Sequence, residues 1–71
     1  RIDEAESELS RALDAAVFAD LPYLRIIHGK GTGALRDLVQ QVLETDPRVA
    51  RWGFPPANQG GSGVTVVEFR A

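Results

Sequence analysis

Residues 24–36, which read LRIIHGKGTGALR, decide how this chain folds. A short apolar run with β-branched residues at 23–27 predicts a buried strand that ends at His28, the only histidine. A loop follows in which every second residue is glycine, and Ala34-Leu35-Arg36 then begins an amphipathic helix. This junction therefore brings an imidazole, a cation and free backbone N–H groups together.

Such a junction is typical of an anion site. Glycine allows positive φ and close approach of the backbone to a ligand. With Thr32 or Gly33 as the expected N-cap, the first N–H groups of the helix lack partners and lie at its positive dipole end, where a phosphate is stabilised. Lys30 lies in the loop, and Arg36 in the first turn is favourable only if it faces an anion. The alternative is a turn that uses glycine for geometry alone.

The chemistry of the loop supports a second role beside binding. An imidazole titrates near neutral pH, so His28 can act as a general acid or base beside a phosphate, and Lys30 can stabilise the developing charge. The structural alternative for His28 is a ring that closes the strand end by a backbone hydrogen bond. The candidate residues are His28 and Lys30 for catalysis, and Gly29, Gly31, Thr32, Gly33 and Arg36 for phosphate or nucleic-acid binding.

The glycine spacing matches neither a Walker loop nor a dinucleotide fingerprint. The sequence also lacks the acidic residue that contacts the ribose about 20 residues after a dinucleotide-binding loop, which argues against a small-nucleotide binder. One histidine without a nearby carboxylate or cysteine makes no metal-ligand set. Any divalent cation would need other ligands, so the cofactor stays open.

Composition indicates a single globular domain over residues 1–71, with 44% hydrophobic and 25% charged residues. The chain has no cysteine, which excludes disulfides and is compatible with a cytoplasmic location. No segment reads as a membrane span or signal peptide. The net charge of −2 argues against a broad basic footprint, yet residues 24–36 hold three bases and no acid, whereas residues 1–20 hold six acids and two bases. This distribution predicts a weak, site-focused phosphate binder.

Hydrophobic periodicity predicts helices at 2–19 and 34–45 and strands at 23–27, 49–54 and 64–69, with a flexible polar loop at 55–63. The fold class is therefore a two-layer α/β sandwich, with both helices on one side of a mixed sheet and the last strand central. A right-handed crossover would supply a further strand ahead of residue 1. The apolar helix positions are Ile2, Ala5, Leu9, Ala12, Leu13, Ala16 and Val17, then Leu35, Leu38, Val39, Val42 and Leu43.

Two further features carry open alternatives. Trp52 and Phe54 fall on one side of their strand and belong either to the core or to a base-stacking surface flanked by Arg48 and Arg51. The glycine-rich loop is either a plain connection or a flap that covers substrate, with Asn58 and Gln59 as donors.

Two motifs carry a family resemblance. His28-Gly29-Lys30-Gly31 matches an HGxG motif, and the run GVTVV at 63–67 is a second anchor. Over essentially its whole length the chain resembles the Smr (small MutS-related) domain, most of all the copy at the C-terminus of bacterial MutS-like anti-recombination proteins. That family has an N-terminal strand with an LDLR-type motif, after which this chain begins. We therefore expect a truncated domain whose strand at 23–27 has an unpaired edge that favours homodimers.

The resemblance implies an endonuclease that nicks DNA, including branched intermediates, and suppresses homologous recombination within a larger MutS-like ATPase. His28 and Lys30 would be catalytic, and the loop would hold the phosphate. Some relatives cleave RNA. The alternative is a non-catalytic module, in which the same loop binds a phosphate of nucleic acid or of the ribosome without cleaving it.

Overall fold

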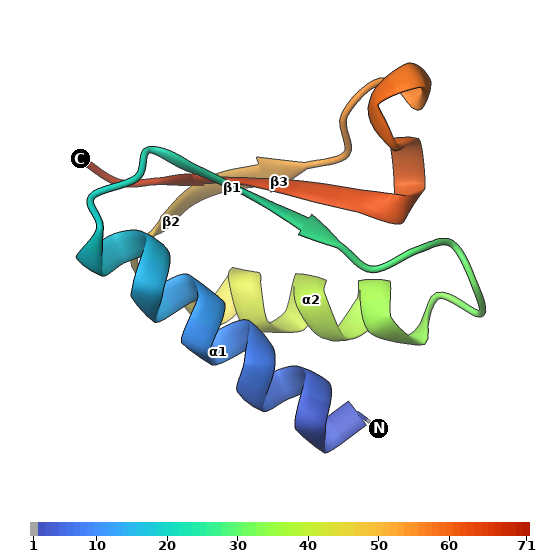
Figure 1. The fold of residues 1–71 in the computed structure, drawn as a ribbon, viewed down its shortest axis with the longest axis horizontal. Helices are drawn as coiled ribbons and strands as arrows, with labels where there is room; N and C mark the ends of the chain where they lie inside the picture. The colour runs from blue at the N-terminus through green and yellow to red at the C-terminus, as the bar shows by residue number, and fades with distance from the viewer. Residues whose placement is uncertain (1) are drawn as a thin grey trace.

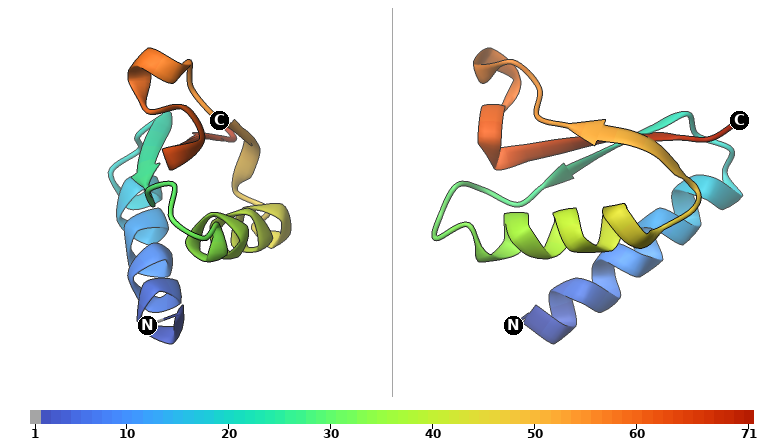
Figure 2. Two further views of the ribbon diagram at one scale, coloured as in Figure 1. Left: turned by 90° about the vertical axis from the view of Figure 1, so that its right-hand side faces the viewer. Right: turned by 180° about the vertical axis from the view of Figure 1, so that it is seen from behind.

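Two helices cover one face of a three-stranded sheet in the computed structural model, which describes residues 2–71 and the side chains of residues 3–71 (Figures 1 and 2). The elements are α1 (Ile2–Phe18), β1 (Tyr23–Ile27), α2 (Ala34–Thr45), β2 (Val49–Gly53) and β3 (Val64–Phe69). The predicted two-layer α/β sandwich is confirmed, and only α1 and β2 end one residue earlier than expected. Neither helix within residues 2–71 is long and apolar enough to cross a membrane.

The last strand is the centre of the sheet, as its doubly apolar sequence predicts. The strand order is β1-β3-β2, and β3 pairs antiparallel with both neighbours. The expected mixed sheet is therefore antiparallel in every pairing among residues 2–71. The reason is topological: β1 and β2 run in the same direction, as a crossover through α2 requires, but β3 lies between them and separates them.

The core lies between the sheet and the two helices. Val67 and Phe69 of β3 pack with helix residues of the predicted stripes, and Trp52 of β2 packs against them from the side. The buried cluster comprises Leu9, Leu13, Ala16, Val39, Leu43, Val49, Val67 and Phe69. This confirms the core position of Trp52.

Some apolar residues do not reach this core. Ala12 and Leu35, expected in the stripes, are exposed and line a groove between α1, β1 and α2 instead. Phe54 lies beyond the end of β2 and is 46% exposed, so the core assignment is wrong for it. The side chain of Ile2, which the stripe of α1 included, lies outside the described residues.

The expected flexible loop at 55–63 is instead folded into two 3-10 turns, η1 (Ala57–Gln59) and η2 (Gly61–Gly63). Backbone hydrogen bonds within the segment hold both turns, and Gly60 at φ 116° joins them because any side chain there would overlap Val64. The segment lies on the sheet face away from the helices (Figure 1), where the Gln59 carbonyl accepts a hydrogen bond from Arg25 at 3.1 Å.

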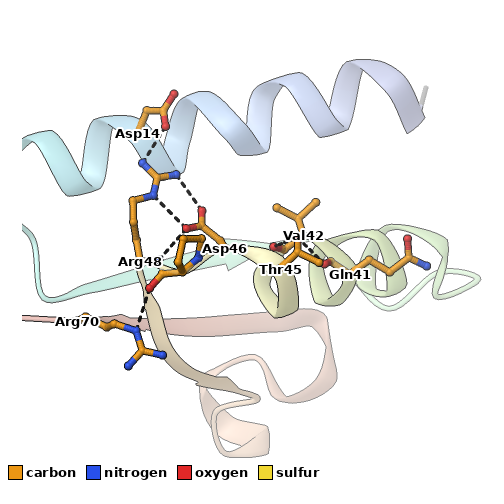
Figure 3. Close-up of polar contacts among 8 residues, drawn as sticks. Asp14, Gln41, Val42, Thr45, Asp46, Arg48 and Arg70 are labelled. Carbon is orange, nitrogen blue, oxygen red and sulfur yellow. Dashed lines mark hydrogen bonds and ion pairs between the residues drawn. The ribbon is translucent and has the colours of Figure 1, made fainter.

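Arg48 ties α1 to the turn between α2 and β2 (Figure 3). Its guanidinium donates to Asp46 at 2.8 Å and to Asp14 at 2.9 Å, and its backbone N–H donates to Asp46 at 2.9 Å. These bonds lower the pKa of Asp46, chiefly through the side-chain hydrogen bond from Arg48, and they raise the pKa of Arg48. Asp14, on the acidic face of α1, therefore has an ion-pair partner although its side chain stays exposed.

We expect Asp46→Asn to lower the free energy of unfolding at pH 7 by about 1–2 kcal/mol, since it removes the charge but keeps an acceptor for Arg48. A lowered folded-state pKa contributes stability above the unfolded-state pKa, and this is lost as the pH falls through the folded-state value. Urea unfolding of both proteins should thus give a difference at pH 7 that shrinks below about pH 4. Glu44→Gln, which changes an exposed carboxylate in the last turn of α2, is the control. A difference that did not depend on pH would contradict the ion-pair explanation.

Candidate nucleic-acid site

The site forms where β1 ends against the start of β3. The carbonyl of Gly63 accepts two hydrogen bonds, from the backbone N–H of His28 at 3.0 Å and from that of Gly29 at 2.9 Å. Gly63 is buried, and a Cβ atom there would lie 3.3 Å from Cγ of Lys30 and 3.5 Å from the carbonyl carbon of Gly29. The loop after β1 therefore lies close against position 63, where a side chain would crowd Lys30.

The His28 ring is held at both nitrogens. Nδ1 lies 2.9 Å from the Gly29 carbonyl oxygen, on the exposed side of the ring. Nε2 lies 2.8 Å from the hydroxyl oxygen of Thr65, in a partly buried contact that crosses from the loop to the central strand. The backbone contact that the structural alternative predicted is thus present, but it occupies only one of the two nitrogens.

Thr65 is a functional candidate that sequence reasoning missed. It is fully buried, and it is the only buried polar or charged residue among those that the structure describes. It pairs with Ile26 across the sheet, which brings it beside the end of β1. The available signal was a hydroxyl in an otherwise apolar central strand, within the GVTVV run.

The loop leads into α2 through a left-handed glycine, as expected for the N-cap. Gly33 has φ 87°, and its carbonyl accepts the first helical hydrogen bond from the N–H of Asp37 at 2.9 Å. The Thr32 hydroxyl oxygen accepts from the Ala34 N–H at 3.3 Å. Gly29 also has positive φ, whereas Gly31 does not. Glycine is therefore required by φ at two of the three loop positions.

Arg36 folds back over this loop. A Cβ atom at Gly33 would lie 2.6 Å from Nη2 of Arg36, so the guanidinium rests against the bare glycine backbone. Its Nε lies 3.7 Å from Oδ1 of Asp37, which offsets part of its charge. The arginine thus faces the positive end of the helix dipole, a position that an anion would stabilise.

All seven predicted site residues line one hollow of about 230 Å³. The hollow is smaller than the cavities of roughly 300–1,000 Å³ that enclose drug-sized ligands. Its size suits a single phosphate group on a longer polymer better than a whole nucleotide. Its lining residues are His28, Gly29, Lys30, Gly31, Thr32, Gly33, Ala34, Leu35 and Arg36.

The structure separates some residues that the sequence grouped together. Arg25 points to the other sheet face and bonds to Gln59, so it does not join Lys30 and Arg36. The proposed aromatic surface is not assembled as expected, because Trp52 packs against the core and Arg48 is engaged by two carboxylates. Arg51 pairs with Glu68 at 2.9 Å. Among the described residues, Lys30 has no ion-pair partner and is exposed.

Within residues 3–71, no group of three or more histidine, cysteine, aspartate or glutamate side chains is placed to hold a metal ion.

Solved structures share this fold. The chain superimposes on the Smr domain of Thermus thermophilus MutS2 with a TM-score of 0.96 and 44% identity, covering all of this chain and 89% of that one. It also superimposes on YdaL, a stand-alone small MutS-related protein from Escherichia coli, with a TM-score of 0.93 and 25% identity, covering 100% of this chain and 59% of that one.

Sequence comparison gives the same relationship. The chain is 54% identical over 69 residues to endonuclease MutS2 of Gemmatimonas aurantiaca and 50% identical over 70 residues to that of Levilactobacillus brevis. These matches cover 97% and 99% of this chain but only 8% and 9% of the relatives' lengths. The model of the Smr domain matches residues 1–70. Fold, loop motif and sequence therefore agree that this chain belongs to the Smr domain family.

Proposed function

We propose that this chain is a DNA-binding endonuclease module that nicks the phosphodiester backbone. The observation that carries the proposal is the hollow at the start of α2, where Lys30, Arg36 and His28 converge on the first N–H groups of a helix. The relatives named endonuclease MutS2 support a nuclease and a DNA substrate. Because those relatives are much longer, we further propose that the module acts within a larger MutS-like ATPase in the cytoplasm, on branched DNA, to suppress homologous recombination.

Each part of the hollow has a chemical task in this proposal. Cleavage requires that a water oxygen attacks phosphorus, that charge on the phosphorane is stabilised and that the leaving oxygen is protonated. Lys30 and the N–H groups of the glycine loop stabilise the negative charge. Arg36 holds the phosphate over the helix N-terminus, and His28 supplies an imidazole ring to the hollow.

We expect His28→Ala to lower nicking of supercoiled plasmid at least about 100-fold, because a positioned donor or acid–base group contributes at least that much. Its affinity for DNA, measured by fluorescence anisotropy, should stay close to that of the unmodified chain. Arg11→Ala, which removes an exposed cation on α1, is the control and should nick normally. Unchanged nicking by His28→Ala would overturn the catalytic role. Binding without nicking by the unmodified chain would favour the non-catalytic module, and branched DNA and RNA would then be compared as ligands.

Phosphate binding makes a separate prediction about salt. Loss of one phosphate contact should reduce the slope of log K against log salt by about 0.9 on duplex DNA. We expect this change for Lys30→Ala, because Lys30 is exposed and unpaired among the described residues. Arg51→Ala removes the same charge from the β2 surface, where Glu68 already offsets it, and should leave the slope nearly unchanged. The reverse result would move the binding surface from the loop to the sheet.

We also propose that the chain self-associates through the edge of β1 that lies away from β3. β1 pairs only with β3 among residues 2–71, and Tyr23 and Ile27 are 57% and 78% exposed. An exposed apolar edge favours pairing with another chain.

We expect the chain to self-associate at high concentration in sedimentation velocity. Ile27→Lys should reduce this association, since a charge on an edge strand opposes pairing. Phe18→Lys alters a still more exposed apolar residue, at the end of α1, and should have no effect. Loss of association only with Phe18→Lys would place the contact on α1, and a monomer at all concentrations would contradict the proposal.

A further inference from the structure

The hydroxyl of Thr65 has a single hydrogen-bond partner within the described residues, Nε2 of His28 at 2.8 Å. Thr65 is fully buried in β3, where water cannot replace a missing partner. A hydroxyl can donate as well as accept, so its role depends on which form of the imidazole ring faces it.

The partner of the other ring nitrogen, Nδ1, shows which form the ring takes. Nδ1 lies 2.9 Å from the carbonyl oxygen of Gly29, and a carbonyl can only accept. Nδ1 therefore carries a proton. In the neutral ring Nε2 is then the acceptor, and the Thr65 hydroxyl donates to it. This arrangement satisfies the buried hydroxyl and both ring nitrogens at once.

The two nitrogens also differ in their access to a ligand. The contact of Nε2 with Thr65 is partly buried, whereas the contact of Nδ1 with Gly29 is exposed, and both His28 and Gly29 line the hollow. A phosphate in the hollow can therefore reach Nδ1 by taking the place of the Gly29 carbonyl as acceptor. It cannot reach Nε2 without breaking the contact with the central strand.

From these observations, and resting on the proposed function, we infer that Thr65 is a positioning residue that presents His28 to the phosphate as an Nδ1–H donor. In this role the ring donates a hydrogen bond to a phosphate oxygen and does not take a proton from the attacking water. Neither nitrogen of the neutral ring is available as a base, because Nδ1 is protonated and Nε2 is covered by Thr65. The task is electrostatic stabilisation of charge that develops on oxygen.

Nitrogen-15 NMR of the ring tests the inference directly, because His28 is the only histidine in the chain. Above the ring's own titration midpoint in the same spectra, Nδ1 should show the shift of a protonated nitrogen and Nε2 that of an unprotonated one. Thr65→Val keeps the shape but removes the hydroxyl that donates to Nε2, so only the Gly29 carbonyl then favours a proton on Nδ1 and the fraction of the Nε2–H form should rise. Thr65→Ser should restore the original pattern. An unprotonated Nδ1 in the unmodified chain, or a pattern that ignores Thr65→Val, would overturn the inference.

Nicking assays test the donor role with a matched pair of substitutions. The amide nitrogen of asparagine can stand near Nδ1 and that of glutamine near Nε2, and neither amide takes up a proton near neutral pH. We therefore expect His28→Asn to retain roughly tenfold more nicking than His28→Gln. Equal loss of nicking in both variants would indicate that His28 acts as a base and would contradict the donor role.

Substitutions of Thr65 should change the rate of nicking and not the affinity for DNA. Thr65→Val should lower nicking about tenfold while DNA affinity is kept, and Thr65→Ser should recover most of it. Thermal unfolding identifies any loss caused by misfolding, and a rate that Thr65→Ser does not recover contradicts the positioning role. An unmodified chain that does not nick overturns the proposed function and with it the role toward substrate. A tautomer independent of Thr65, in a chain that does nick, overturns the positioning role alone.

Discussion

The double hydrogen bond to the carbonyl of Gly63 is the constraint on which the site depends. It joins the backbone of His28 and Gly29 to Gly63, the residue immediately before the central strand, at 3.0 and 2.9 Å. Because β3 is paired on both sides, this joint anchors the loop to the most rigid part of the sheet. It fixes the backbone at the start of the glycine loop, from which the imidazole ring projects and which leads into α2.

The pattern of neutralised charges explains how an acidic chain can present a local anion site. Arg48 is engaged by Asp14 and Asp46, and Arg51 is engaged by Glu68, so these cations contribute little outside their pairs. Lys30 has no such partner among the described residues and lies beside the helix N-terminus. Lys30 therefore contributes an uncompensated positive charge to the hollow, although the net charge of the chain is −2.

Local patterns predicted the elements well, because strand and helix periods and glycine turns depend on neighbouring residues. The strand before His28, the N-cap at Gly33 and the central position of β3 follow from such patterns. The turns at 57–63 did not follow from such patterns. Their conformation depends on hydrogen bonds within the segment and on its contact with Arg25. Phe54 was misplaced because β2 ends one residue before it, and a one-residue change in strand length decides which side chains are buried.

The sequence by itself determined the strand–loop–helix junction, the residues that line its hollow and the family resemblance that the comparisons bear out. Each of these depends on residues within a short stretch of chain. Only the tertiary structure placed Nε2 of His28 against the hydroxyl of Thr65, because Thr65 lies 37 residues further along the chain. It also decided which cations stay free, since an ion pair such as that of Arg48 with Asp14 forms only when α1 lies beside the turn between α2 and β2. Contacts between distant segments require the completed fold, and no local pattern encodes their geometry.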